Sequence, residues 1–473
     1  MTAPLWTAAE AAAATGARAA GTWAATGISI DSRSVAAGDL FVALAGPSFD
    51  GHDFVVDALA KGAAAAMVAR LPAGVAADAP LLVVDDTLAG LGRLGAAARA
   101  RTGARIVAVT GSAGKTSTKE ALRWVLSRQG LTAASAASHN NHWGVPLSLS
   151  KMPRAAAFGV FEIGTNHPGE IAPLSRLVRP HVAVVTTVAE AHIEFFATVE
   201  AIADEKADIM AGLEPGGTAV LNRDIATFAR LAASARARGV ARVIAFGRHA
   251  DAAARALNVH ADGAGSRISA DIAGLNVDYQ LPVPGTHWVS NSLAVLAAVH
   301  ALGGDVAAAA AAFADLPALD GRGRHHRVAV GRGTITVIDE SYNANPASMR
   351  AAFETLAAAA PGPGGRRIAV LGDMLELGAQ APALHAALAA PIAAQRIDRV
   401  YCAGAAMRHL YDALPAAARG AWGERSEAIV AAVKDDLRDG DVVMIKGSLG
   451  SRMKAVLQAL LAAGAPPSSA NAA

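Results

Sequence analysis

The sequence predicts an α/β protein of three domains, in which a central parallel sheet is flanked by a small N-terminal α/β domain and a C-terminal α/β domain. Three observations lead to this prediction. The chain has 473 residues, which suits about three domains at roughly 100–200 residues each. Hydrophobic residues make up 53% and charged residues 17%, a balance typical of chains with sizeable cores. Apolar, β-rich runs are each followed by a helical stretch, as in parallel sheets covered on both faces.

The N-terminal domain is expected over residues 1–100. Its strands are predicted by short apolar runs between turn-forming residues, at 28–30, 40–44 and 81–84. A helical stretch at 54–63 lies between these runs, and a helical connector at 87–101 leads onward. This alternation is that of a small α/β unit.

The central domain is expected over residues 101–316. Its parallel strands are predicted at 105–110, 157–163, 181–188, 218–222 and 242–246. Helices are predicted at 169–178, 198–213 and 287–302, and residues 251–283 are expected to add antiparallel strands.

The C-terminal domain is expected over residues 317–473. A stretch at 316–326, rich in Gly, Pro and charge, predicts a linker at its start. Its strands are predicted at 334–339, 366–373, 399–404 and 441–447. The tail at 464–473 is expected to be disordered.

Composition excludes several classes of function. The net charge of +2 and the aromatic content of 4% argue against a nucleic-acid partner. No apolar stretch of about eighteen residues predicts a membrane span, and the start of the chain does not resemble a secretory signal. Cys402 is the single cysteine, so an internal disulfide and a cysteine metal cage are excluded. A cytoplasmic protein with no membrane partner is therefore expected.

A glycine-rich phosphate loop is the most informative segment of the chain. A buried strand runs into this loop, which leads directly into a helix beginning near Ser117. The loop residues are Gly111, Ser112, Ala113, Gly114, Lys115, Thr116 and Ser117. Glycines permit close backbone approach, and the free N–H groups of a helix start bind anions. Lys115 would lie along the β- and γ-phosphates and Thr116 would ligate Mg²⁺. The alternative, an ordinary glycine turn, is less favoured because Gly-Lys-Thr follows a strand and precedes a helix.

The loop departs from the general phosphate-binding pattern in one position. That pattern places a glycine five residues before Gly114, where this chain has Val109. The contracted form and the lack of a clear guanine-binding signature favour ATP over GTP.

Three polar residues follow successive predicted strands. Glu162 closes one strand, His192 follows the next, and Lys206 lies on the helix after it. Parallel strands end at one edge of a sheet, so Glu162 and His192 are expected beside the phosphate loop, where they could hold Mg²⁺. Each residue alone is more often a solvated loop charge or part of a helix surface. The shared edge makes the two explanations equal for Glu162 and His192, whereas Lys206 beside metal ions is unfavourable unless its charge is altered. Asn141, with Asn140 before it, either caps a helix or binds a polar ligand.

Several segments are similar to successive motifs of the Mur ligase family, over nearly the whole chain. They are Asp31-Ser32-Arg33 with 38–54, then 110–117, 140–149, 161–171, 188–196, 284–291, 321–326, 339–349, 372–378 and 446–448. The resemblance implies a P-loop ATPase-type central sheet, a Rossmann-like C-terminal domain and a monomer.

The resemblance also implies roles for individual residues. Lys115, His192 and Lys206 would be catalytic, with Lys206 carbamylated and therefore anionic. Thr116, Glu162, His192 and the carbamate would bind two Mg²⁺ ions. Asn291, Arg322 and Asp339 would contact ATP. Ser32, Arg33 and Asn141 would contact the nucleotide-sugar substrate, and Tyr342, Asn343 and Asn345 the dipeptide or the reacting centre.

The activity implied by the resemblance is ATP-dependent peptide ligation. It would join D-alanyl-D-alanine, bound by the C-terminal domain as it closes on ATP, to a UDP-N-acetylmuramoyl-tripeptide bound by the N-terminal domain. An acyl phosphate would form, and ADP and phosphate would be released. The alternatives are a relative that takes meso-diaminopimelate or glutamate as the amine, and a nucleotide-binding regulator without ligase chemistry. Whether diaminopimelate or lysine is the third residue of the tripeptide is left open.

Overall fold

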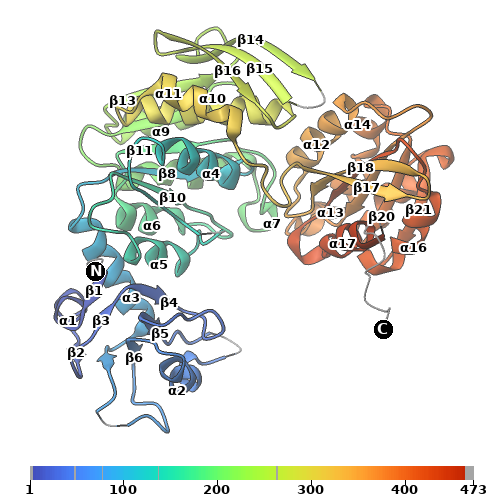
Figure 1. Ribbon diagram of the computed structural model, residues 1–473. Helices are drawn as coiled ribbons and strands as arrows, with labels where there is room; N and C mark the ends of the chain where they lie inside the picture. Colours follow the sequence, from blue (N-terminus) through green and yellow to red (C-terminus); the bar gives the residue numbers. More distant parts are fainter. Residues whose placement is uncertain (1–3, 47–48, 77, 137, 263–264, 464–473) are drawn as a thin grey trace.

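Three main β-sheets, each with its own helices, and one small two-stranded ribbon make up the described part of the protein (Figure 1). The computed structural model describes residues 4–46, 49–76, 78–136, 138–262 and 265–463, so the tail expected to be disordered lies outside the described residues. The main sheets take their strands in turn from residues 18–83, 105–281 and 324–446. The α/β prediction is thereby confirmed, with the central sheet lying between the other two.

The central sheet has nine strands in the order β16-β15-β14-β13-β12-β11-β8-β10-β9. Seven of them run parallel: β8 (Arg105–Thr110), β9 (Thr132–Ala134), β10 (Phe158–Glu162), β11 (Val182–Val185), β12 (Thr218–Asn222), β13 (Arg242–Gly247) and β14 (Ala254–Asp262). Five of these strands are the predicted ones, and β9 is additional. The antiparallel addition expected over 251–283 is only partly so: β14 pairs parallel with β13, and β15 (Gly265–Ile272) and β16 (Leu275–Leu281) complete the sheet in antiparallel pairing.

Helices bury both faces of this sheet. On one face lie α4 (Lys115–Leu126), α10 (Thr286–Ala301) and α11 (Val306–Ala312). On the other lie α5 (Gly144–Ser150), α6 (Ile171–Val178), α8 (Val199–Ala207) and α9 (Phe228–Ala237). Because helices cover both faces at the centre of the sheet, strands such as β11, Val-Ala-Val-Val, are buried at every position, whereas β14 and β16 at one edge are partly exposed.

The N-terminal domain is a five-stranded sheet in the order β2-β7-β6-β5-β4. Its strands are β2 (Arg18–Ala19), β4 (Gly27–Ser29), β5 (Asp39–Val42), β6 (Ala65–Val68) and β7 (Leu81–Val83). A small ribbon of β1 (Trp6–Thr7) and β3 (Ala24–Ala25) lies beside α1 (Ala8–Thr15), which Thr7 and Glu10 start with a capping box. The remaining helices are α2 (Val55–Ala60) and α3 (Thr87–Ala100), and α3 packs on α5 of the central domain.

The C-terminal domain has six strands in the order β17-β18-β22-β19-β20-β21. They are β17 (Arg324–Val330), β18 (Gly333–Glu340), β19 (Arg367–Gly372), β20 (Arg399–Ala403), β21 (Arg419–Gly423) and β22 (Val442–Lys446). All but β17 run parallel. The helices are α12 (Pro346–Ala358), α13 (Ala381–Ala386), α14 (Ala389–Ala394), α15 (Met407–Ala413), α16 (Ser426–Asp436) and α17 (Lys454–Ala463).

Two predicted segments differ in the structure. The helix expected over 198–213 ends as α8 at Ala207 and continues as a 3₁₀ turn, because the Ser175 hydroxyl bonds the Ile209 carbonyl and accepts from the Gly212 N–H. The linker expected over 316–326 is shorter, since β17 begins at Arg324 by pairing with β18. No helix among the described residues is long and apolar enough to cross a membrane.

The central and C-terminal domains meet at α7 (Ile193–Phe196), which extends from the central domain toward α13 (Figure 1). Ile193 is buried in the same hydrophobic cluster as Met374 and Leu377 of the C-terminal domain. The two domains therefore share apolar packing next to His192, the residue that starts α7.

Truncation of Leu122 tests the central core. Leu122 is fully buried under β8 and α10, so Leu122→Ala should lower the free energy of unfolding by about 2–5 kcal/mol. The matched control is Leu131→Ala, because Leu131 is 54% exposed and should change stability by less than about 0.5 kcal/mol. Urea unfolding followed by circular dichroism measures both, and equal losses would contradict the assigned core.

Candidate active site

The phosphate loop lies between β8 and α4, in a space that admits only glycine at two positions. Gly111 has φ 152°, and a Cβ there would lie 1.9 Å from Thr186 Oγ1. Gly114 has φ 81°, and a Cβ there would lie 2.7 Å from Asn291 Oδ1. Both glycines are therefore required by positive φ and by close approach of β11 and α10.

The start of α4 forms an anion-binding surface. The helix begins at Lys115, two residues earlier than expected, and no side chain caps it. Its first N–H groups have no intrahelical acceptor and carry the positive end of the helix dipole. The amide Nδ2 of Asn291, a residue that is 7% exposed, has no hydrogen-bond partner beside this loop. The arrangement suits a phosphate group next to a polar ligand atom.

Lys115 folds back over the loop in this structure. Its Nζ donates to the Gly111 carbonyl at 2.8 Å. Burial lowers the pKa of Lys115, while Glu162 opposes this shift and Arg322 adds to it. Lys115 and Arg322 thus bring two basic groups close together, which favours a bound anion.

A chain of hydrogen bonds joins the loop to the neighbouring strand and to the C-terminal domain. Thr116 Oγ1 donates to Glu162 Oε2 at 2.8 Å, and Asn140 Nδ2 donates to Glu162 Oε1 at 2.8 Å. Arg322 Nη2 donates to Thr116 Oγ1 at 2.9 Å. Glu162 is 1% exposed, so its carboxylate is held in place at the edge of the sheet.

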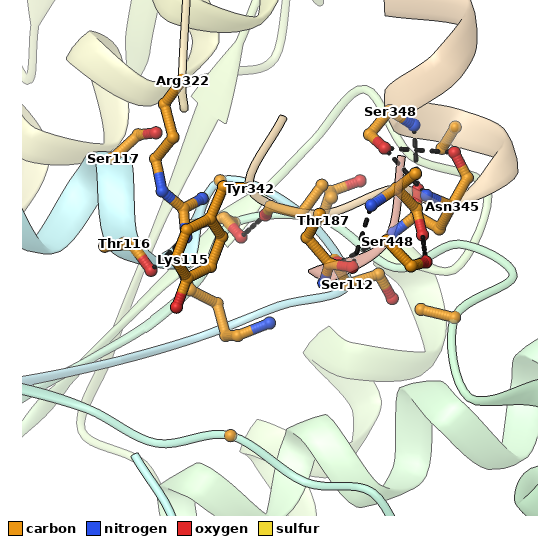
Figure 2. A pocket seen from close by; sticks show the side chains of 18 of the residues that line it. Ser112, Lys115, Thr116, Ser117, Thr187, Arg322, Tyr342, Asn345, Ser348 and Ser448 are labelled. Carbon is orange, nitrogen blue, oxygen red and sulfur yellow. Dashed lines mark hydrogen bonds between the residues drawn. The ribbon is translucent and has the colours of Figure 1, made fainter. Parts of the chain in front are cut away.

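The C-terminal domain brings further polar groups to the same place (Figure 2). The Arg322 guanidinium lies 4.2 Å from the centre of the Tyr342 ring, and the Tyr342 hydroxyl contacts that of Ser138. Asn345 Nδ2 donates to the Ser112 carbonyl at 3.1 Å, while its Oδ1 caps α12 by accepting from Ser348. Asn345 thus positions both its own helix and the phosphate loop.

His192 lies at the domain interface, and Lys206 is buried on α8. The ring of His192 bonds through Nδ1 to Glu376 of the C-terminal domain. Lys206 is 2% exposed. Burial, with the charge of Lys115, lowers the pKa of Lys206 to about 7.

These groups line one cavity of about 530 Å³ between the central and C-terminal domains. The predicted site residues that line it are Ser112, Ala113, Gly114, Lys115, Thr116, Ser117, Glu162, His192, Asn291, Arg322, Tyr342, Asn343 and Asn345. Glu162, His192 and Lys115 therefore share one edge of the sheet, as the strand order predicted.

Six predicted site residues do not line this cavity, and one of them is Gly111 of the phosphate loop itself. Ser32 and Arg33 lie in the N-terminal domain, where Arg33 pairs with Asp31. Asn141 accepts from the Gly144 N–H at 3.0 Å and so starts α5. Asp339 accepts from the Gly321 N–H at 2.8 Å and thereby holds the turn that carries Arg322. Lys206 is near enough to Lys115 for their charges to interact.

Sequence reasoning did not assign Asn140 or Glu376 to the site. Asn140 holds Glu162, and its neighbour Asn141 was chosen instead because the two amides are equivalent in sequence. Glu376 lies in the segment 372–378 after β19, so its place at the carboxyl end of a parallel strand was the available signal.

Comparisons with known proteins agree along the length of the chain. Residues 24–99 match the Mur ligase family, catalytic domain, residues 109–299 match the Mur ligase middle domain, and residues 323–449 match the Mur ligase, glutamate ligase domain.

Individual relatives cover nearly the whole chain. It is 35% identical to the UDP-N-acetylmuramoyl-tripeptide–D-alanyl-D-alanine ligase of Escherichia coli, over 92% of this chain and 93% of the relative. MurF from Acinetobacter baumannii has a similar structure, with a TM-score of 0.84 and 28% identity over 97% of this chain and 99% of the other. MurF ligase from Thermotoga maritima in complex with ADP is also similar, with a TM-score of 0.77 and 26% identity over 92% of this chain and 97% of the other. The chain belongs to the Mur ligase family.

Proposed function

We propose that this protein joins D-alanyl-D-alanine to UDP-N-acetylmuramoyl-tripeptide, with hydrolysis of ATP to ADP and phosphate, in the synthesis of peptidoglycan precursors. One observation carries the proposal: a phosphate loop, a buried carboxylate and polar groups of two domains line a single cavity. The name of the Escherichia coli relative supplies the two substrates. We place the reaction in the cytoplasm and assign it to a monomer.

The proposal divides the substrates among the three domains. Residues 1–100, which carry Ser32 and Arg33, take the nucleotide-sugar peptide. Residues 101–316 bind ATP through the phosphate loop, with Asn291 toward the adenine. Residues 317–473 close over ATP with Arg322, which Asp339 holds in place, and bind the dipeptide. Tyr342, Asn343 and Asn345 are the contacts proposed for the dipeptide or for the reacting centre.

The residues present fit Mg²⁺. Thr116 Oγ1 and the carboxylate of Glu162 are hard oxygen donors 2.8 Å apart. Mg²⁺ in nucleotide sites is usually held by one or two carboxylates together with phosphate oxygens and water. His192 is the proposed protein ligand of a second ion. Ions bound there would neutralise charge on the phosphates. Among the described residues, no group of three or more His, Cys, Asp or Glu side chains is arranged to hold a metal.

The chain's own residues meet the electrostatic demand of the reaction. A carboxylate oxygen of the tripeptide attacks the γ-phosphorus of ATP, the bond to ADP breaks, and an acyl phosphate forms. The dipeptide amine then attacks the carbonyl carbon, phosphate leaves and the amine loses a proton. Because carboxylate and triphosphate repel each other, Lys115 and Arg322 lower the barrier by stabilising negative charge. The enclosing C-terminal domain protects the acyl phosphate from water.

Lys206 is proposed to be carbamylated. Its pKa of about 7 leaves much of the amine neutral near neutral pH, and only a neutral amine attacks CO₂. The resulting carbamate is an anion, which suits a position beside Lys115 and a metal ion. The neutral fraction falls as the pH drops through about 7, so carbamylation is favoured above that value.

The choice of amine tests the proposed function. We expect ADP release to require both the UDP-N-acetylmuramoyl-tripeptide and D-alanyl-D-alanine. Meso-diaminopimelate and glutamate are the comparison amines and should give no turnover above background. Product formation with either of them, but not with the dipeptide, would assign the chain to a different ligase activity.

Lys115→Ala tests the phosphate loop. We expect ADP formation to fall at least 10²–10³-fold, because a charged donor to the transferring phosphate is lost. The melting temperature should hardly change, since within the described residues the Lys115 side chain bonds only the Gly111 carbonyl of its own loop. Lys454→Ala, an exposed lysine at the start of α17, is the control and should retain full activity. Undiminished turnover in Lys115→Ala would refute the assigned role.

Lys206→Ala tests the carbamate. We expect most activity to be lost, and partly regained when acetate or another short-chain carboxylic acid supplies the missing anion. Initial rates with and without the acid measure this, and Lys115→Ala should show no such recovery. Full activity of the unsupplemented Lys206→Ala variant, or no recovery at any acid concentration, would contradict carbamylation.

A further inference from the structure

Glu376 contacts His192 but has no role in the proposed reaction. It belongs to the loop after β19, in the C-terminal domain, and its carboxylate accepts from Nδ1 of His192 in the central domain. A carboxylate can only accept hydrogen bonds, so Nδ1 carries the proton, and in the neutral imidazole the lone pair of Nε2 stays available.

The loop is built to present Glu376. Each of the three residues before it is held by a different element. Asp373 accepts from the Met407 N–H at the start of α15, at 2.8 Å. The Met374 N–H donates to Nε2 of the buried His385 at 3.0 Å. The Leu375 N–H donates to Ser448 Oγ at 3.0 Å.

Both partners of the contact adopt strained backbone conformations. His192 has φ 57° and Glu376 has φ 62°, although neither is glycine. Left-handed conformations of such residues are uncommon and cost energy, so they persist where surrounding structure enforces them and are concentrated at functional sites. Here two of them face each other across a domain boundary.

The backbones around the contact also approach closely. The Glu194 N–H donates to the Glu376 carbonyl at 3.3 Å. A Cβ at Gly378 would lie 3.2 Å from the side chain of Glu194. Ile193 packs with Leu377 in the core of the C-terminal domain. The segment of the central domain that follows His192 is thereby clamped to the loop that carries Glu376.

We propose that Glu376 is a positioning residue, whose carboxylate orients His192 so that Nε2 serves as a metal ligand. Metal-binding histidines usually donate their other ring N–H to a carboxylate or carbonyl, which fixes the tautomer and raises affinity. In this protein the carboxylate comes from a different domain. Metal binding at His192 is therefore coupled to the docking of the C-terminal domain. This inference rests on the proposed function, which makes His192 a metal ligand.

The test compares full-length variants by three measurements. The first is the affinity for Mn²⁺ in the presence of ADP, from the electron paramagnetic resonance of free Mn²⁺. The second is the concentration of Mg²⁺ that half-saturates the ligase reaction, with kcat determined separately. The third is the tautomer of His192, from long-range ¹H–¹⁵N correlation spectra.

Glu376→Ala should weaken Mn²⁺ binding about 10–100-fold, the usual effect of losing such a partner. It should raise the half-saturating Mg²⁺ concentration more than it lowers kcat, and His192 should no longer be held in the Nδ1–H tautomer. Glu376→Gln retains an acceptor oxygen and should lose less than Glu376→Ala. Glu427→Ala, an exposed glutamate of the same domain, is the control and should match the unmodified protein.

A double variant shows whether Glu376 affects Mn²⁺ binding through His192. Adding Glu376→Ala to His192→Ala should cause no further loss of Mn²⁺ affinity, because the carboxylate acts through the imidazole. Additive losses, or unchanged affinity and tautomer in Glu376→Ala, would overturn this inference alone. If the unmodified protein neither binds Mn²⁺ nor ligates the dipeptide, the proposed function fails and the inference fails with it.

Discussion

Backbone crowding around the phosphate loop determines where the rest of the site must lie. Thr186, just after β11, donates to the Ala113 carbonyl at 2.5 Å, and Asn222 at the end of β12 donates to the Thr186 carbonyl at 2.8 Å. The loop is thus held by the carboxyl ends of two neighbouring strands. No residue larger than glycine fits at position 111, because its Cβ would collide with Thr186. An anion bound at the start of α4 is therefore fixed relative to the sheet edge. Residues that directly follow the strands ending at this edge lie near that anion.

The same loop also orients the C-terminal domain. Arg322 reaches Thr116, and Asn345 reaches the Ser112 carbonyl while capping α12. Arg322 comes just before β17, and Asn345 comes just before α12. One strand and one helix of the C-terminal domain are therefore attached to the loop by hydrogen bonds at two points. Together with the apolar contact of Ile193, these bonds make the position of the C-terminal domain sensitive to what the loop binds. A ligase that must shield an acyl phosphate from water requires such a dependence.

The sequence sufficed for elements whose cause is local and failed where the cause is a tertiary contact. The structure of the segment from Arg105 to Thr116 can be predicted from its own residues, because an apolar strand, glycines and a helix start are adjacent in the chain. The assignment of Asn141 instead of Asn140 could not be avoided, since only the direction of each side chain in the fold separates a helix cap from a partner of Glu162. The early end of α8 likewise depends on Ser175, a residue on another helix.

Some buried or partly buried cations of the protein are paired with carboxylates. Arg99 pairs with Glu214 and Arg366 with Asp441 away from the site, and Lys446 pairs with Glu340 within the cavity. Within the part of the chain that the structure describes, Lys115, Lys206 and Arg322 form no such ion pair; Lys115 bonds a carbonyl and Arg322 a hydroxyl. Lys115 and Arg322 are partly buried and bring two positive charges to one loop, so a polyanion bound there would neutralise both. The charge of Lys115 has a second effect: after burial, it is the next cause of the lowered pKa of Lys206.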